Sequence, residues 1–192
     1  MSAIDTTDVA TGILRAAIGV VFMLHGWNHA FGGGRIAGTA GWFESLGMRP
    51  GRLHAWAATV VELVGGFLLV LGLLTPFAAA ALLGTMVVAF VTNHRRNGFF
   101  IFRPGEGYEY VLVLGFVLAC LGGLGGGRLT LDHGLGIFGA TWTSLILTLV
   151  FGVVGGLVQI LLFWRPHAAE PAAGTDIAGD ELGDGTAEWA ET

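Results

Sequence analysis

The chain contains no lysine, a single cysteine and few charged residues of any kind. All nine basic residues are arginine. Only 12% of the 192 residues are charged, whereas an ordinary soluble domain has about 25%. The one thiol, Cys120, excludes an internal disulfide, a CxxC redox pair and a zinc site built from cysteines. No basic stripe indicates a nucleic acid partner.

Apolar residues make up 54% of the chain and lie in long blocks. A helix needs about 20 apolar residues to cross a bilayer, so each block is a candidate membrane span. The short "LTPF" link requires the second and third spans to form an antiparallel hairpin. We therefore predict an all-α, multi-pass membrane protein in the lipid bilayer. The five candidate spans are residues 9–31, 54–74, 76–92, 108–124 and 143–164.

The rest of the chain divides by composition. The loop 32–53 contains "AGWFESLGM", whose aromatic and apolar residues predict a segment at the membrane interface. Residues 165–192 are rich in alanine, glycine and acids, which predicts a disordered acidic tail. We expect a four-helix membrane core at 9–133, an additional transmembrane helix at 143–164, and this tail. No basic residue precedes the first span, so we expect a permanent anchor.

Arginine placement predicts the orientation of the chain. The loops on one side of the membrane carry seven arginines, and the other side has only Arg15 and Arg128. Because basic loops stay in the cytoplasm, we expect an inner (plasma) membrane protein with its N-terminus out and its C-terminus in. Soluble redox partners would then dock at the cytoplasmic face. The seven arginines are Arg35, Arg49, Arg52, Arg95, Arg96, Arg103 and Arg165.

Glu62 is the deepest charged residue in the predicted spans. At about 1.5 Å per helical residue, it lies within about 3 Å of the membrane midplane, and Arg15 lies roughly 7 Å to the N-terminal side. A lone carboxylate is costly in hydrocarbon, so Glu62 should be protonated, paired or facing a wet cavity. Two interpretations stay open: a structural ion pair between Arg15 and Glu62, or a catalytic Glu62 that accepts protons.

A second polar group is predicted nearer the cytoplasmic side. His25 and His29 lie four residues apart and so share one helical face. His25 and Glu109 fall about 8–10 Å from the midplane, with His94 closer to the interface. These four residues are candidate ligand-binding groups, although the two neighbouring histidines also suit a helix that simply leaves the membrane. The cofactor stays open. A quinone is favoured over a metal ion and over haem, whose axial ligands would be His25 together with either His94 or His54.

Two further patterns concern how the spans are anchored and packed. Gly152 and Gly156 form a GxxxG pair, which favours close contact with a neighbouring helix. Most of the large polar aromatics fall near predicted span ends, as is typical of an aromatic belt at the interface. They are Trp27, Trp42, Tyr108, Tyr110, Trp142 and Trp164.

Several short motifs, in order, are similar to those of DoxX-type membrane proteins. "LHGWNHAFGG" resembles the end of that family's first helix, with His29 where a lysine is usual. "ELVGGFLLVLGLLTPFAAAALLGTM" resembles the hairpin of its second and third helices, with Glu62 as the family's acid. "GGGRLTLD" resembles the segment after the fourth helix, and "WFESLGM" also fits. The resemblance covers roughly residues 11–133 and implies a four-helix membrane core.

The resemblance also implies a range of functions. Some family members are subunits of membrane oxidoreductases that pass electrons from sulfur compounds to quinone, and others are linked to thiol and oxidative stress. We therefore expect a membrane-embedded, quinone-facing subunit of a redox complex, which need not be an enzyme by itself. The alternatives are an accessory to a small-molecule or lipid permease, and a structural assembly protein without catalysis.

Overall fold

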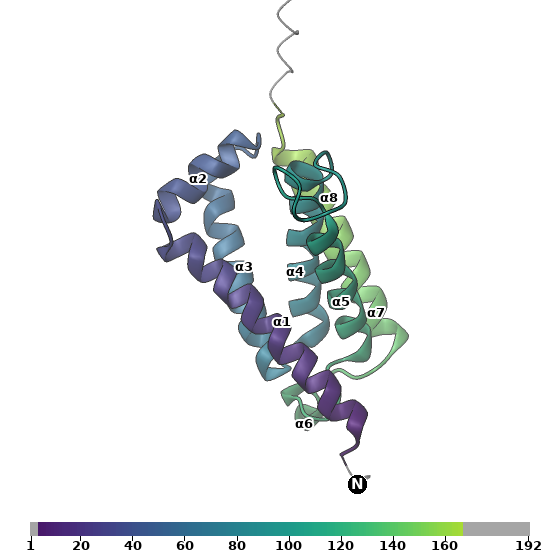
Figure 1. Cartoon of the computed structure of the whole chain (residues 1–192). Helices are drawn as coiled ribbons and strands as arrows, with labels where there is room; N and C mark the ends of the chain where they lie inside the picture. Colours follow the sequence, from purple (N-terminus) through teal and green to yellow (C-terminus); the bar gives the residue numbers. More distant parts are fainter. Residues whose placement is uncertain (1–3, 167–192) are drawn as a thin grey trace, which may run out of the picture.

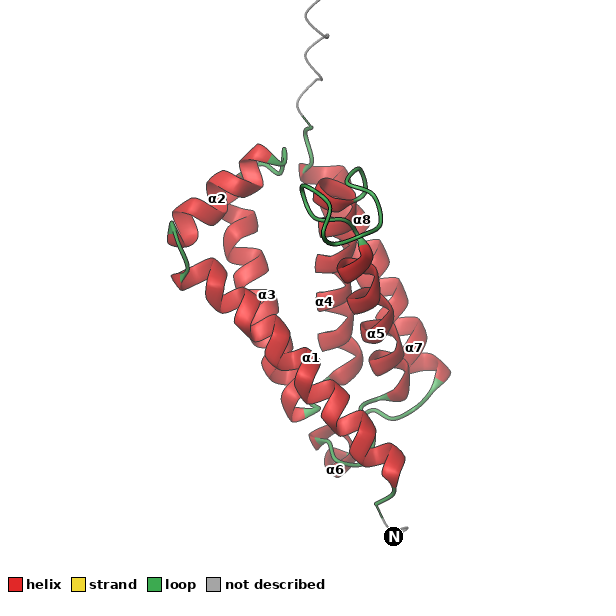
Figure 2. Cartoon of the chain, viewed as in Figure 1, coloured by secondary structure: helices red, strands yellow, loops and turns green. Residues whose placement is uncertain are grey.

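The computed structural model describes residues 4–166, and every regular element in that range is a helix (Figures 1 and 2). Four helical stretches are long and apolar enough to cross a membrane. The all-helical, multi-pass membrane fold is therefore confirmed. The stretches are α1 (Thr6–Phe31), α3 (Gly51–Leu71), α4 with η1 (Thr75–His94), and α7, η2 and α8 (Trp142–Phe163).

Another apolar helix, α5 (Glu109–Leu124), has 16 residues and is shorter than these four. The number of membrane crossings and the separate status of the last helix therefore stay predictions. Helix α2 (Arg35–Ser45) occupies the loop expected at the membrane interface. A one-turn helix, α6 (Leu131–Leu135), follows α5. The predicted acidic tail lies outside the described residues, apart from its first two positions.

Helices α1 and α3 pack closely because glycines remove the side chains between them. A Cβ atom on Gly19 would lie 2.6 Å from the carbonyl oxygen of Gly66. A Cβ atom on Gly26 would lie 3.0 Å from both the backbone nitrogen of Leu63 and the carbonyl oxygen of Thr59. This pairing is antiparallel, so the middle of α3 faces the C-terminal half of α1. Small residues at helix interfaces supply van der Waals contact where lipid offers no hydrophobic driving force.

The last helix packs against α4 in the same way. A Cβ atom on Gly156 would lie 2.9 Å from the carbonyl oxygen of Gly84, and one on Gly152 would lie 3.0 Å from that of Ala80. The predicted GxxxG contact is thus present, with α4 as its partner. Two π-helical turns, η1 (Phe90–His94) and η2 (Val150–Val154), interrupt these two helices.

The helices form two groups that meet at the N-terminal end of α1 and diverge toward α2 (Figure 1). At the joined end Arg15 donates to the carbonyl oxygens of Leu69, Val70 (2.8 Å) and Leu129 (2.7 Å). The buried Asp132 carboxylate accepts from the backbone N–H groups of Leu74 and Thr75, both at 2.7 Å. These bonds fix the α3–α4 turn and the loop after α5 against α1.

Candidate functional site

A cavity of about 410 Å³ lies between the two helix groups, in the half of the bundle nearer α2. Ligand pockets usually measure about 300–1,000 Å³ and place a few polar groups on apolar walls, and this cavity has that character. Its polar side chains come from α1, α3, η1, α5, α8 and the loop before α5. They are His25, His29, His54, Glu62, Asn93, His94, Glu106, Tyr110 and Gln159, with Thr85 and Thr92 from α4 and η1.

Glu62 and His29 form the centre of this polar group. Glu62 projects from the middle of α3 and is 4% exposed, and His29 projects from the last turn of α1. His29 Nε2 lies 3.2 Å from Glu62 Oε2, at ion-pair distance but without hydrogen-bond geometry. Within the described part of the chain, that oxygen accepts no hydrogen bond. Charges this close interact more strongly in a medium of low dielectric than in water.

The predicted ion pair between Arg15 and Glu62 is wrong. Arg15 bonds to three backbone carbonyls at the opposite end of the bundle, and the side chain within ion-pair distance of Glu62 is His29. The reason is the antiparallel register of α1 and α3. It sets Gly26 against Leu63 and Gly19 against Gly66, so Arg15 lies opposite the end of α3. The residue count along α1 from Gly26 to Arg15 corresponds to about 16 Å, beyond the reach of its side chain.

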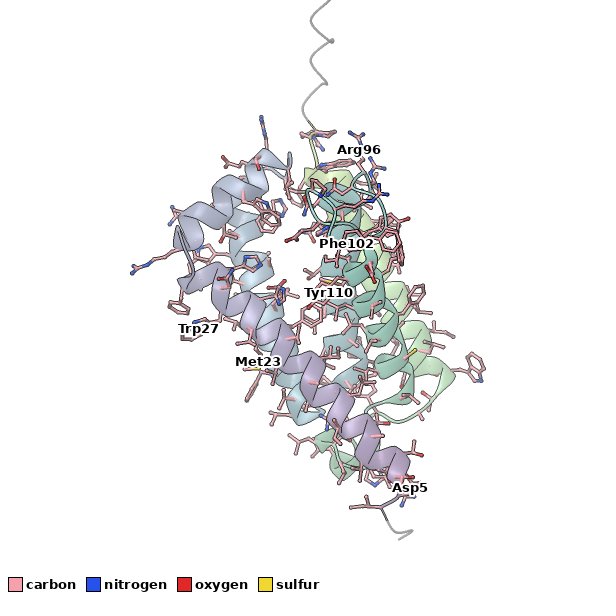
Figure 3. All side chains as sticks on the ribbon, viewed as in Figure 1. Asp5, Met23, Trp27, Arg96, Phe102 and Tyr110 are labelled. Atoms are coloured by element: carbon pink, nitrogen blue, oxygen red, sulfur yellow. The ribbon has the colours of Figure 1, made fainter. Side chains whose placement is uncertain are left out.

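His25 lies on the open side of the cavity. Its Nδ1 is 2.9 Å from the carbonyl oxygen of Val21, and its ring stacks near Tyr110 of α5 with centroids 6.2 Å apart. Both side chains line the cavity and both are exposed. Tyr110, expected from sequence only as an interfacial anchor, is therefore also a cavity residue. Figure 3 shows it between α5 and α1.

His94 also lines the cavity, at the end of the π-helical turn η1. Its Nδ1 lies 2.9 Å from the backbone oxygen of Glu106. Glu109, expected beside it, does not line the cavity. The Glu109 carboxylate instead accepts from the backbone N–H of Ile101 at 3.2 Å. The acidic residue of this segment that does line the cavity is Glu106, because the chain turns between Glu106 and the start of α5.

Two further cavity residues, His54 and Gln159, lie outside the predicted ligand-binding set, and His54 was named only as a possible haem ligand. His54 is 2% exposed, and its Nδ1 lies 3.1 Å from the Gln159 amide nitrogen of α8. The contact joins α3 to the last helix across the cavity. Gln159 could have been identified from the sequence, because it is the one amide side chain in the body of an apolar span. Such a side chain needs a polar partner inside the membrane.

The arrangement offers proton exchange and hydrogen bonding, with apolar walls around it. In residues 4–166 no group of three or more His, Cys, Asp or Glu side chains is arranged to hold a metal ion. The three histidines considered for haem, His25, His54 and His94, all line the cavity. Their imidazoles, the Glu62 carboxylate and the Tyr110 hydroxyl can donate to or accept from a neutral polar ligand.

The fold and the cavity define a class: a multi-pass helical membrane protein with a polar cavity in one half of its bundle. Residues 10–95 match the family model described as DoxX, which confirms the resemblance over that part of the chain. The match runs from α1 to the end of η1. It includes His25, His29, His54, Glu62 and His94 and excludes Tyr110 and Gln159.

The chain is also similar to a curated protein of Bacillus subtilis (strain 168) named "Putative oxidoreductase CatD". The two are 28% identical over 107 residues, which are 56% of this chain and 74% of that protein. No solved structure matches the chain.

Proposed function

We propose that this protein is the quinone-binding membrane subunit of a redox complex. The cavity supports this function because it combines apolar walls with a buried carboxylate–imidazole pair, Glu62 and His29. Reduction of a quinone to a quinol takes up two electrons and two protons. A site for that reaction needs space for a planar ring, donors for its carbonyl oxygens and a route for protons.

In this proposal Glu62 and His29 hold and transfer the protons, and His25 and Tyr110 donate to the quinone oxygens. His54, oriented by Gln159, lies on the far wall of the same cavity. The electrons come from a soluble redox protein that docks at the cytoplasmic face. The relative named as an oxidoreductase supports a redox role, and the match to the DoxX family model supports a membrane subunit.

The cavity distinguishes this proposal from a purely structural role. Polar residues that only pair helices lie between packed helices, as Arg15 does with its three carbonyls. Glu62 and His29 instead face a space that side chains leave open. A carboxylate placed there is costly for stability, and a proton-transfer function accounts for that cost.

Quinone binding to the purified protein tests the proposal. Decylubiquinone added to the full chain in nanodiscs should quench tryptophan fluorescence, because Trp42 lines the cavity and quinones are efficient quenchers. The quenching should saturate, and Trp42→Phe should remove most of it. His29→Ala should weaken binding severalfold, whereas His133→Ala, at an exposed histidine near the joined end, should not. Non-saturable quenching that is equal in all variants would contradict the proposal.

A catalytic test follows in membranes. Deletion of the gene should lower electron transfer to quinone, and the wild-type gene should restore it. Glu62→Gln should assemble normally and fail to restore it. Unchanged quinone reduction after a clean deletion would argue against any redox role.

A further inference from the structure

Two walls of the cavity are closed by packed side chains. Toward the joined end, Phe22, Leu69, Leu82 and Leu118 belong to one buried cluster that connects α1, α3, α4 and α5. A second cluster connects α2 and α3 to α4 and α8 and lines the cavity beside α2. It contains Phe43, Met48, Ala55, Ala58, Val88 and Ile160.

The end nearest the predicted cytoplasm is closed by backbone contacts, which we name the clasp (residues 46–49 with 163–165). Arg49 N donates to Phe163 O at 3.1 Å, and Arg165 N donates to Gly47 O at 2.7 Å. The Trp164 indole N–H donates to Leu46 O at 2.9 Å. The Arg95 guanidinium lies 5.4 Å from the Trp164 ring centroid. The clasp thus joins the two helix groups where they diverge.

The side of the cavity between α1 and α5 is sparsely packed. Helix α1 packs extensively against α3 but meets α5 at few residues. At the level of the cavity the two helices are bridged by the rings of His25 and Tyr110. Each of these residues lines the cavity and has an exposed side chain. In Figure 3 Tyr110 lies in this gap.

We infer that the cavity is filled from the lipid phase, through a lateral portal between α1 and α5 that His25 and Tyr110 gate. The ligand class is then a lipid-soluble molecule with a planar polar ring and an apolar tail, whose ring enters the cavity while its tail stays in the bilayer. That the ring is a quinone rests on the proposed function, whereas the portal rests on the packing. A water-soluble substrate would have to pass the clasp.

Thiol accessibility tests the portal without reference to any redox activity. Ala58, buried and lining the cavity, is changed to cysteine in a Cys120→Ser background, and the full chain is placed in proteoliposomes. N-cyclohexylmaleimide, which partitions into lipid, should label Ala58→Cys. A charged methanethiosulfonate present on both sides should label it severalfold more slowly. Wild-type Cys120, exposed on α5, is the positive control for the lipid-phase reagent.

The decisive comparison is between labelling rates with and without a larger side chain in the portal. Tyr110→Trp should slow maleimide labelling of Ala58→Cys severalfold, and Phe116→Trp, at an outward-facing position of α5 that does not line the cavity, should not. Because the same thiol is labelled with and without Tyr110→Trp, its intrinsic reactivity, which depends on its thiolate fraction, does not affect the comparison. Equal labelling by the charged reagent, an unchanged rate in Tyr110→Trp, or labelling only after unfolding in SDS would each overturn the portal. A functioning portal with no saturable decylubiquinone binding would overturn the proposed function alone.

Discussion

At the scale of single residues, the position of the Glu62 carboxylate bears on whether this residue has a structural or a chemical role. Glu62 is buried and lines the cavity, and the side chain within ion-pair distance of it is a histidine, which can be neutral or charged. An arginine partner would hold the carboxylate permanently ionised, because a guanidinium does not lose its proton. A histidine partner leaves proton transfer between the two groups open.

We therefore expect Glu62→Gln to separate folding from activity. Glutamine has nearly the same shape and can pair with a neutral His29, so the unfolding temperature in detergent should change little. Quinone reduction in membranes should fall to the level of the gene deletion, because an amide cannot accept the proton. Size-exclusion profiles and thermal unfolding would establish assembly. Loss of the folded protein would instead assign Glu62 a structural role.

Arg15 should behave in the opposite way. Its planar guanidinium donates to three carbonyls on two segments, and lysine cannot reproduce that fork. We expect Arg15→Lys to destabilise the protein by about 1.5–3 kcal/mol, the range for a hydrogen bond to a charged group. Decylubiquinone affinity in the remaining folded protein should be unchanged. Chemical unfolding followed by binding measures both, and a selective loss of binding would mean that Arg15 acts at the cavity.

The sequence predicts how deep these residues lie but not where they point. Counting residues along the spans placed His25, His29 and His94 in the same half of the bundle, and all three line one cavity. Direction around the helix axis was not available, because lipid-facing and protein-facing surfaces of a membrane helix are both apolar. Two other features were also hidden. The register of α1 against α3, which separates Arg15 from Glu62, and the turn that brings in Glu106 instead of Glu109 both depend on tertiary packing.

At the scale of helices, glycines set the contacts and π-helical turns lie beside the cavity. The turn η1 ends at His94, and η2 is followed by Gly155 and Gly156, all of which line the cavity. Extra residues inserted into a helical turn redirect side chains, and such turns are frequent at functional sites. The bounds of the long helices followed closely from apolar block lengths. The π-helical turns did not, because nothing in hydropathy reports a change of hydrogen-bond register.

Two adjacent glycines of α8 give a matched test of the glycine contact. A Cβ atom on Gly156 would press on Val87 and on the Gly84 carbonyl oxygen, whereas one on Gly155 would meet no atom within 4 Å. We expect Gly156→Ala to destabilise the protein by about 1–3 kcal/mol through overpacking. Gly155→Ala should be neutral or stabilising by up to about 1 kcal/mol. Thermal unfolding of the two variants in one detergent makes the comparison, and equal effects would contradict the contact.

At the scale of the whole molecule, the two ends of the bundle differ in charge and in construction. The end fixed by Arg15 and Asp132 is held by hydrogen bonds to backbone groups. The end closed by the clasp carries the arginine-rich loops around α2 and before α5. The polar cavity lies in this second half, so the orientation of the chain decides from which side protons and redox partners reach it.

We expect the arginine-rich end to face the cytoplasm. Green fluorescent protein fused after the last residue should therefore fluoresce, because it matures in the cytoplasm. Alkaline phosphatase fused there should be inactive, because it matures only outside the cytoplasm. The same reporters at the N-terminus should give the reverse result. Replacing Arg95 and Arg96 with glutamine should weaken the bias and yield mixed signals, whereas replacing Arg128 should strengthen it. An active phosphatase at the C-terminus would show that the orientation is the reverse of the predicted one. A cytoplasmic electron donor could then not reach the end of the bundle beside the cavity.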